Sequence, residues 1–232
     1  MKDFTLTVIV PFYNEELFLE QSVSNLINEN FCDQIIMVND ASTDTSINIA
    51  KKLINNYNNI SLINIESNLG KGNAIKEAIK NIKTTHVTIH DADLEYYPSD
   101  LKEMAEVSKL NPEYIILGSR FNGKKERTNI YFRTYSANKI MSLFFSFIFL
   151  KKVSDIATCY KLFPAEASKE LDLKEKGFGV EVELTAKLLK KQLNIIECPI
   201  NYSARSYEEG KKIKFKDGIN YIIKTMYYRF FD

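Results

Sequence analysis

The segment VTIHDADLEYYPSD (residues 87–100) joins a short apolar run to two aspartates one residue apart. The run from Val87 to His90 predicts a buried strand. In an open α/β sheet, ligands bind beyond the carboxyl ends of the strands, so Asp91 and Asp93 are expected to face a crevice there. An Asp-x-Asp sequence by itself is more typical of a solvated turn.

The chemistry of the two aspartates indicates a cation site. Adjacent anionic carboxylates repel each other, so they are commonly arranged around a positive ion. Hard oxygen ligands with open coordination positions suit Mg²⁺ or Mn²⁺ that holds a phosphate-bearing substrate. Glu95 lies two residues beyond Asp93 and is a candidate third ligand. The predicted metal ligands are therefore Asp91, Asp93 and Glu95.

Strand-like runs alternate with amphipathic helical segments over the first half of the chain. The expected strands are residues 4–10, 35–38, 60–65, 87–90 and 114–117. Apolar residues at helical spacing predict helices between them, the first of which carries Leu17, Leu19, Val23, Leu26 and Ile27. This alternation predicts an α/β fold, Rossmann-like, with a doubly wound and mostly parallel sheet.

Each expected strand ends in a loop of polar and small residues. In chain order these loops are PFYNEE, NDASTD, NLGKG, DADLE and GSR. The carboxyl ends of parallel strands share one edge of a sheet, so the five loops are expected to meet in one crevice. Their convergence favours a ligand site over a set of unrelated turns. The spacing matches neither a P-loop nor a GxGxxG dinucleotide motif.

The composition is that of a globular protein rather than a nucleic-acid-binding one. The 232 residues are 45% hydrophobic and 26% charged, with a formal net charge of +1. The three cysteines are too widely spaced for a metal pair or a disulfide framework, which fits a reducing cytoplasm. The beginning of the chain lacks a signal-peptide layout, and no apolar run reaches the length of about 20 residues that spans a bilayer.

Two apolar segments stand apart from the strand–helix alternation. Residues 139–152 contain IMSLFFSFIFL closed by Lys151 and Lys152, and residues 213–232 predict a basic amphipathic helix. The face of that last helix would hold Ile219, Ile222, Ile223, Met226, Tyr227 and Phe230. Residues 139–152 fit either a buried core helix or an interfacial helix on a membrane, and their basic flanks favour the second. The last helix fits a membrane surface and a packed position on the sheet or a partner subunit equally. The expected division is residues 1–212 as the main domain and residues 213–232 as the terminal helix.

In their order and spacing, these motifs resemble a family. PFYNEE, VNDASTDTS, NLGKG, DADLEYYPSD, GSR and YSARSYEEGKKIKFKDG resemble family 2 glycosyltransferases with the GT-A fold. The segments RTYSANK, DIATCYKLF and RSYEEGKK narrow the resemblance to polyprenyl-phosphate sugar synthases, the dolichol-phosphate mannosyltransferase-like branch. The likeness covers nearly the whole chain.

The resemblance implies roles for individual residues. Those expected at a nucleotide sugar are Pro11, Tyr13, Glu15, Val38, Asp40, Lys71, Asp91, Ala92, Arg205 and Lys211. Those expected at an acceptor phosphate are Arg120, Arg133 and Ser136. The catalytic residues would be Asp91, Asp93 and Arg120. Glu95 stands where mannosyl synthases typically carry Gln, which leaves the identity of the donor sugar open.

The chemistry of such a transfer is coherent with these residues. A nucleotide sugar leaves as a diphosphate, whose developing charge a divalent cation and Lys or Arg stabilise. A phosphate monoester acceptor is largely ionised near pH 7, since its second pKa is about 6, and so needs no strong base. His90 is accordingly expected to pack in the core, and His86 to begin a strand. A sugar hydroxyl acceptor would instead need a carboxylate base, for which Glu181 and Glu183 are candidates.

Three functions therefore stay open at the level of sequence. The first is an inverting enzyme that moves a hexose from GDP-mannose or a UDP-hexose to polyprenyl phosphate, peripheral on the cytoplasmic face of a membrane. The second is a soluble glycosyltransferase acting on a saccharide hydroxyl in surface polysaccharide synthesis. The third is a non-catalytic nucleotide-sugar-binding protein. A homo-oligomer is the arrangement that would bury the apolar helices without lipid.

Overall fold

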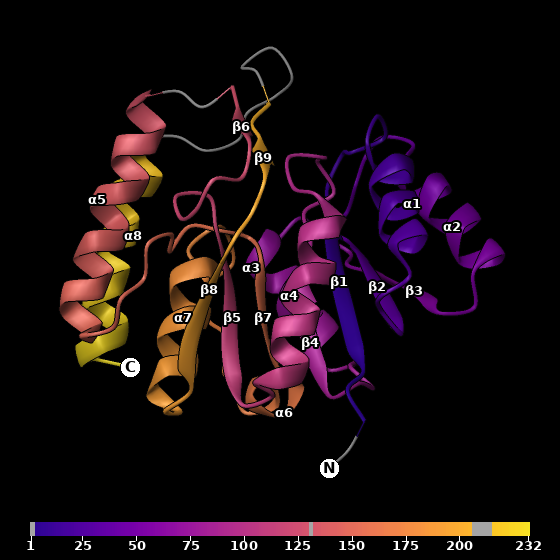
Figure 1. The fold of residues 1–232 in the computed structure, drawn as a ribbon. Coiled ribbons are helices and arrows are strands. Elements are labelled where there is room, and N and C mark those ends of the chain that lie inside the picture. Colours follow the sequence, from indigo (N-terminus) through magenta and orange to yellow (C-terminus); the bar gives the residue numbers. More distant parts are fainter. Residues whose placement is uncertain (1–2, 130–131, 206–214) are drawn as a thin grey trace.

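A seven-stranded sheet forms the centre of the computed structural model, which describes residues 3–129, 132–205 and 215–232, with backbone only at 132–133 and 215–219 (Figure 1). The strands follow the order β3-β2-β1-β4-β7-β5-β8. Their bounds are β1 Leu6–Phe12, β2 Gln34–Asn39, β3 Ile60–Asn64, β4 His86–Ile89, β5 Tyr114–Ser119, β7 Lys161–Pro164 and β8 Asn194–Pro199. All neighbouring strands are parallel except β7, which is antiparallel to β4 and β5. The predicted mostly parallel α/β sheet is confirmed.

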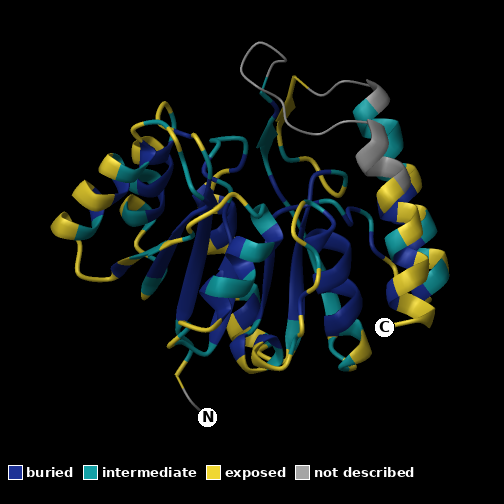
Figure 2. Cartoon of the chain, turned by 180° about the vertical axis from the view of Figure 1, so that it is seen from behind, coloured by how far each residue is buried: buried dark blue, intermediate teal, exposed yellow. Residues whose placement is uncertain are grey.

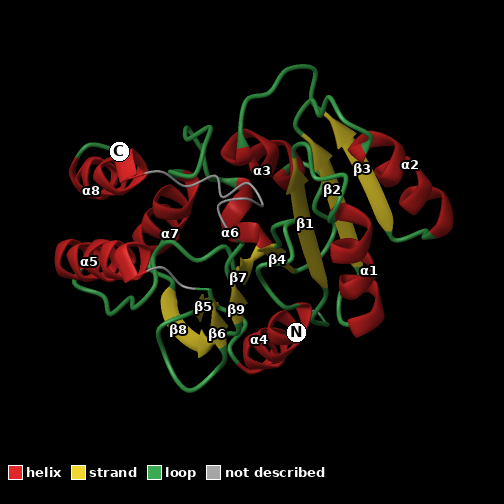
Figure 3. Cartoon of the chain, turned by 90° about the horizontal axis from the view of Figure 1, so that it is seen from above, coloured by secondary structure: helices red, strands yellow, loops and turns green. Residues whose placement is uncertain are grey.

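Helices cover both faces of this sheet (Figure 3). The bounds are α1 Leu19–Glu29, α2 Ser46–Asn56, α3 Lys71–Ile79, α4 Pro98–Leu110, α6 Ala165–Lys169 and α7 Val180–Lys190. Seen from above, α1, α2 and α4 lie on one side of the sheet, and α3, α6 and α7 lie on the other. The inner strands are almost entirely buried (Figure 2), as expected for a doubly wound sheet, whereas the edge strands β3 and β8 are mostly half-buried or exposed.

Two local expectations for the first strand and helix differ from the structure. β1 continues two residues beyond the predicted end at Val10, through Pro11 to Phe12. Pro11 is tolerated there because β4 pairs with β1 only as far as Ile9, so that side of the strand needs no N–H donor. Leu17 is 80% exposed and precedes α1, so it does not belong to the apolar stripe of that helix.

The two apolar segments form neighbouring helices at one side of the molecule. They are α5, Phe132–Phe149, and α8, Phe215–Phe230, which contact each other, and α8 also packs against α7 (Figures 1 and 3). Each has a buried face, exemplified by Phe145 on α5 and Tyr228 on α8. Within the described ranges, no helix is both long and apolar enough to cross a membrane.

The outward sides of α5 and α8 carry many exposed apolar side chains. These residues, here called the α5–α8 apolar face, are Ile140, Leu143, Phe147, Leu150, Ile222, Ile223, Met226, Tyr227, Phe230 and Phe231. Phe147 is 73% exposed and Ile223 is 61% exposed. The face predicted for the terminal helix points outward from Ile222 onward, while Tyr221, Thr225 and Tyr228 provide the inward contacts, and the side chain of Ile219 lies outside the described residues.

A short second sheet crosses the carboxyl edge of the main one. It pairs β6, Arg127–Thr128, with β9, Tyr202–Ser203 (Figure 1). The buried carboxylate of Asp100 anchors the segment that enters β9, since it accepts hydrogen bonds from the backbone N–H of Asn201 at 2.7 Å and from its side-chain amide at 2.9 Å. Residues 201–205, here called the strap, are thereby held across the carboxyl ends of the strands of the main sheet.

Candidate active site

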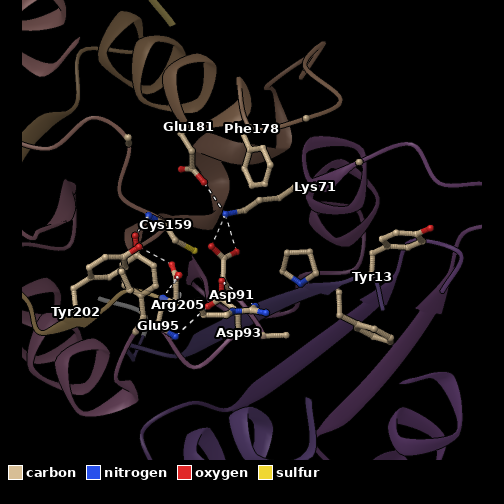
Figure 4. Close-up of a pocket in the computed structure, with 18 of the residues that line it drawn as sticks. Tyr13, Lys71, Asp91, Asp93, Glu95, Cys159, Phe178, Glu181, Tyr202 and Arg205 are labelled. Atoms are coloured by element: carbon tan, nitrogen blue, oxygen red, sulfur yellow. Dashed lines mark hydrogen bonds and ion pairs between the residues drawn. The ribbon is translucent and has the colours of Figure 1, made fainter. Parts of the chain in front are cut away.

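A cavity of about 290 Å³ opens at the carboxyl edge of the sheet (Figure 4). All five loops predicted to converge contribute to its lining, through residues such as Glu15, Asp40, Lys71, Asp91 and Arg120. The first turns of α5 contribute as well, and so does α8 through Tyr221. The convergence expected from the strand ends is confirmed, and the site also reaches the two apolar helices.

The Asp-x-Asp motif sits in a tight turn directly after β4. Leu94 has a φ of 61°, a backbone region that is uncommon for residues with a side chain. The backbone N–H of Glu95 donates to Asp93 Oδ1 at 3.1 Å, which closes the turn. The side chains of Asp91 and Asp93 are 22% and 21% exposed and both line the cavity. The strand thus presents both carboxylates at one opening.

A row of four charged groups of alternating sign leads from this motif into the core: Asp91, Lys71, Glu181 and Lys161. Lys71 Nζ lies 2.7 Å from Asp91 Oδ1 and 2.8 Å from Glu181 Oε1 (Figure 4). The other oxygen of Glu181 lies 2.5 Å from the fully buried Lys161 Nζ. Burial disfavours the charged ammonium of Lys71, but Asp91 and Glu181 outweigh it and raise the pKa of Lys71 well above its usual value. Lys71 is therefore a permanent cation beside the first aspartate.

Arg205 places a second cation beside the other aspartate. Its Nη2 atom lies 3.3 Å from Asp93 Oδ2 and 3.1 Å from Glu15 Oε2. Its guanidinium also lies over the ring of Phe18 at 4.8 Å. The strap thus ends in an arginine aimed at the Asp-x-Asp turn, where a phosphate group could take the place of the carboxylates.

Glu95 holds the strap rather than facing the two aspartates. Its Oε1 accepts the backbone N–H of Arg205 at 2.8 Å, and its Oε2 accepts the hydroxyl of Tyr202 at 2.6 Å. The backbone carbonyl of Glu95 accepts a third hydrogen bond from Ser203 at 2.9 Å. Both carboxylate oxygens are thus engaged by the segment that carries Arg205.

The residues present fit a divalent cation held by two carboxylates. Within the described ranges, no group of three or more His, Cys, Asp or Glu side chains is arranged to hold a metal ion. Asp91 and Asp93 nevertheless share the cavity, and Mg²⁺ or Mn²⁺ is commonly held by one or two carboxylates with substrate phosphates completing the shell. Asp91, Asp93 and Glu95 are therefore not arranged as one set of three metal ligands. Binding of a divalent cation by Asp91 and Asp93 alone stays a prediction.

Asp40 shapes the NLGKG loop on the opposite side of the cavity. Its two oxygens accept the backbone N–H groups of Leu69 at 2.9 Å and of Gly70 at 2.7 Å. Gly70 has a φ of 93°, which favours glycine, and a Cβ there would lie 2.6 Å from the carbonyl oxygen of Lys176. This loop leads directly into α3 and fixes the start of the Lys71 side chain.

Arg120, which the resemblance places at an acceptor phosphate, lines the cavity but is tightly held. Its Nε and Nη2 atoms donate to Oδ2 and Oδ1 of Asp155 at 2.7 and 2.8 Å, and Asp155 is fully buried. The guanidinium also lies 4.9 Å from the ring centre of Tyr202. A bidentate pair uses only part of the donor fork of an arginine, so the guanidinium keeps N–H groups for a ligand in the cavity.

His90 takes the packing role expected of it. Its ring nitrogens lie 2.9 Å from Ser22 Oγ and 2.9 Å from the Tyr160 hydroxyl, and the residue is 1% exposed. Burial lowers the pKa of His90 to about 4, so the imidazole is neutral at pH 7. His86 begins β4 as predicted. Neither histidine lines the cavity.

Most of the sequence-predicted site residues lie around the cavity. Those that line it are Pro11, Tyr13, Glu15, Asp40, Lys71, Asp91, Ala92, Asp93, Glu95, Arg120 and Arg205. Val38 is fully buried within the sheet, and Ser136 is only half-buried and is not part of the lining. Lys211 and the side chain of Arg133 fall outside the described residues.

Several lining residues were not predicted from the sequence. They include Tyr96, Cys159, Phe178, Tyr202 and Tyr221. Burial raises the pKa of the Cys159 thiol well above its ordinary value, so it stays protonated beside Asp91. Tyr96 follows Glu95 directly and Tyr202 precedes Arg205 by three residues, so closeness to a predicted ligand residue was an available signal for both. Cys159, Phe178 and Tyr221 come from segments whose position only the tertiary fold determines.

Comparison with known proteins gives a family match over most of the sheet. The family model described as "Glycosyl transferase family 2" matches residues 7–172. Glycosyltransferase AglJ of Haloferax volcanii is 26% identical over 203 residues, which is 85% of this chain and 63% of that protein. The UDP-N-acetylglucosamine–dolichyl-phosphate N-acetylglucosaminyltransferase of Methanococcus voltae is 28% identical, over 92% of each chain. The dolichol-phosphate mannosyltransferase of Pyrococcus furiosus is 26% identical over 89% of this chain, which spans 58% of that protein.

Solved structures share the fold. Glucosyl-3-phosphoglycerate synthase from Mycobacterium tuberculosis, in complex with Mn²⁺, uridine diphosphate and its product, superposes with a TM-score of 0.72 at 16% identity. The similarity covers 97% of this chain and 80% of that one. At this identity the likeness concerns the fold, and it agrees with the GT-A architecture expected from the sequence.

Proposed function

Because this chain belongs to glycosyl transferase family 2, we propose that it moves a hexose from a nucleotide sugar to a polyprenyl phosphate at a membrane surface. The observation that carries the proposal is the position of the cavity. It is bounded by the Asp-x-Asp turn, by the first turns of α5 and by Tyr221 of α8, and the exposed apolar residues of both helices follow directly along each helix. A lipid phosphate has that division, since its charged head and its apolar chain need different surroundings.

On the donor side, the two aspartates and two cations suit a nucleoside diphosphate. Asp91 and Asp93 would hold a divalent cation, which supplies positive charge to the diphosphate as it leaves. Lys71 and Arg205 stand within 3.3 Å of these carboxylates and are placed to bind phosphate oxygens. Relatives described as acting on dolichyl phosphate support this class of reaction, whereas the donor base and sugar are open between GDP- and UDP-linked hexoses.

On the acceptor side, Arg120 and the start of α5 would meet the phosphate head. Thr134, Tyr135 and Asn138 line this part of the cavity, and Lys139 Nζ lies 5.8 Å from the ring centre of Tyr135. One phosphate oxygen would attack the anomeric carbon while the bond from that carbon to the diphosphate oxygen breaks. A single displacement of this kind inverts the anomeric centre.

Two alternatives from the sequence are less well supported by the site. A saccharide hydroxyl would need a carboxylate base. Glu181 is 3% exposed and lies between two lysines, and Glu183 accepts the backbone N–H groups of Lys174 and Glu175. Neither carboxylate is available to take a proton from a substrate. A protein that only binds a nucleotide sugar would not need the part of the cavity that Arg120 and the start of α5 line.

The test of this function is product formation from labelled GDP-mannose, UDP-glucose and UDP-N-acetylglucosamine, each with polyprenyl phosphate and Mg²⁺ or Mn²⁺. We expect a lipid-extractable product with one of the donors, and none when the cation is chelated. Transfer to a saccharide with no lipid product would establish the second alternative. Nucleotide binding without any transfer would establish the third.

The α5–α8 apolar face is proposed to lie on the membrane, on its cytoplasmic face. Replacing Phe147 and Ile223 together by serine should lower binding to vesicles of phosphatidylcholine and phosphatidylglycerol at least about a hundredfold, because burial of each apolar side chain contributes about 1.5–3 kcal/mol. Flotation of the protein with vesicles measures this. Leu110→Ser is the matched control, since Leu110 is 83% exposed at the end of α4, outside the face.

The result also separates lipid from a second copy of the chain. If the double variant floats like the unmodified protein, the face does not meet lipid. If the unmodified protein is a dimer that the same two substitutions dissociate, the face is a subunit contact instead. The expected division of the chain into a main domain of residues 1–212 and a terminal helix of residues 213–232 stays a prediction, as does membrane binding by the α5–α8 apolar face.

Glu95 allows a test that separates a metal ligand from a strap anchor. Glu95→Ala removes two hydrogen bonds to the strap, so we expect a donor KM about tenfold higher, because each bond to a charged group contributes about 1.5–3 kcal/mol and part of the strap remains anchored through Asp100. The Mn²⁺ concentration for half-maximal activity should stay unchanged. A large rise in that concentration, with donor KM unaffected, would instead make Glu95 a metal ligand.

A further inference from the structure

Residues 173–178 form a loop, here called the 173–178 loop, between α3 and α8. It follows the end of the family match at residue 172, and α8 also lies beyond that match. Two of its residues, Gly177 and Phe178, line the cavity. Phe178 stands close to Lys71 in Figure 4. The loop therefore contacts the cavity on the side where the donor is proposed to bind.

On one side, the 173–178 loop is packed tightly on the start of α3. The carbonyl oxygen of Lys176 accepts the backbone N–H of Gly72 at 2.6 Å. A Cβ at Gly72 would lie 2.0 Å from the carbonyl oxygen of Glu175, so no side chain fits between the loop and this helix. Gly70 is packed against the carbonyl oxygen of Lys176 in the same way. Lys71, whose ammonium pairs with Asp91, lies in the sequence between these two tightly packed glycines.

On the other side, the same loop is bonded to α8. Glu175 Oε1 accepts the hydroxyl of Tyr228 at 2.8 Å and pairs with the ammonium of Lys224. The hydroxyl of Tyr221 donates to the carbonyl oxygen of Phe178 at 2.9 Å. Tyr228 is 1% exposed and Glu175 has a side chain only 14% exposed, so water competes little for these bonds.

We propose that Glu175 is a positioning residue that ties α8 to the start of α3 and thereby fixes Lys71 in the donor site. This inference rests on the proposed function, because it assigns the C-terminal helix a part in donor binding in addition to any surface contact. The path runs from Lys224 and Tyr228 through Glu175 to the backbone of the 173–178 loop, and from there to Gly72 and Lys71.

The test compares two nearly isosteric changes on α8. Tyr228→Phe keeps the buried ring and removes the hydroxyl that reaches Glu175. Thr225→Val removes a buried hydroxyl that bonds only within the helix, to the carbonyl oxygen of Tyr221. Glu175→Ala removes the carboxylate of the 173–178 loop that binds both Tyr228 and Lys224. Amide hydrogen exchange of the peptide spanning residues 68–76 is measured for all three, together with the Kd of UDP and of GDP in the presence of Mn²⁺.

We expect faster exchange of that peptide in both Tyr228→Phe and Glu175→Ala. The Kd should be about fivefold higher in Tyr228→Phe, because one hydrogen bond contributes about 1 kcal/mol, and higher still in Glu175→Ala, which also loses the ion pair with Lys224. Thr225→Val should match the unmodified protein in both measurements. The donor KM should rise with kcat unchanged, since the reacting groups are untouched.

Unchanged exchange in Tyr228→Phe and Glu175→Ala would overturn the proposal, as would an equal change in Thr225→Val. If neither nucleotide binds the unmodified protein, the proposed function fails, and the exchange comparison still decides whether Glu175 holds the start of α3.

Discussion

Replacement of Asp93 by asparagine is expected to lower the transfer rate about a thousandfold, because the cation it helps to hold stabilises the leaving diphosphate by several kcal/mol. The asparagine keeps the size of the side chain and, through its carbonyl oxygen, the hydrogen bond from the backbone N–H of Glu95. The loss therefore reports charge rather than shape. The measurement is the initial rate of product formation over a range of Mn²⁺ concentrations.

Glu106→Gln provides the control for this change. Glu106 lies on α4, pairs with Lys109 and has a side chain 65% exposed, so loss of its charge should leave the rate unchanged. The protein with Asp93→Asn should also keep its unfolding midpoint, because the aspartate is partly exposed and its ion pair with Arg205 is long at 3.3 Å. A rate within tenfold of the unmodified enzyme would remove Asp93 from the metal site.

Replacement of Arg120 by methionine is expected to lower the free energy of unfolding by about 3–5 kcal/mol, because it leaves the buried carboxylate of Asp155 without its partner. Transfer to the acceptor should be lost as well, even under conditions where the variant is folded. Urea denaturation measures the first effect, and the rate at saturating donor measures the second.

The double variant Arg120→Met with Asp155→Leu separates the two roles of this arginine. Replacing both partners by apolar side chains of similar volume removes the unpaired charge, so most of the stability should return. The acceptor KM should nonetheless stay high, since the cation is still missing. Recovery of full activity together with stability would mean that Arg120 holds the fold and does not contact the acceptor.

The sequence predicts which loops surround this site because the position of each loop is determined by the end of the strand before it. The β-branched runs that became β1, β2, β4 and β5 end in polar loops, and a parallel sheet has only one edge where such loops can meet. That geometry placed Glu15, Asp40, Asp91 and Arg120 around one cavity without reference to any side-chain contact.

The remainder depends on contacts between segments far apart in the sequence. No local pattern pairs Lys71 with Glu181, and none indicates that Glu95 would bind the strap instead of standing beside Asp93. Val38, predicted at the nucleotide, is fully buried inside the sheet, because the last residues of a buried strand and the first of its loop look alike in sequence. Amphipathic spacing indicated the helix α8, but not that its inward tyrosines would reach the 173–178 loop.

In the proposed reaction, a phosphate head is the nucleophile and its apolar chain lies along α5 and α8. The most direct test compares kcat/KM for polyprenyl phosphate, for the short geranyl phosphate and for polyprenol without phosphate, with one donor and Mn²⁺. We predict that geranyl phosphate is a substrate with kcat/KM at least about tenfold lower, because less apolar surface is buried. Polyprenol should give no product. Transfer to polyprenol, or to a sugar hydroxyl in preference to either phosphate, would mean that a hydroxyl and not a phosphate is the nucleophile.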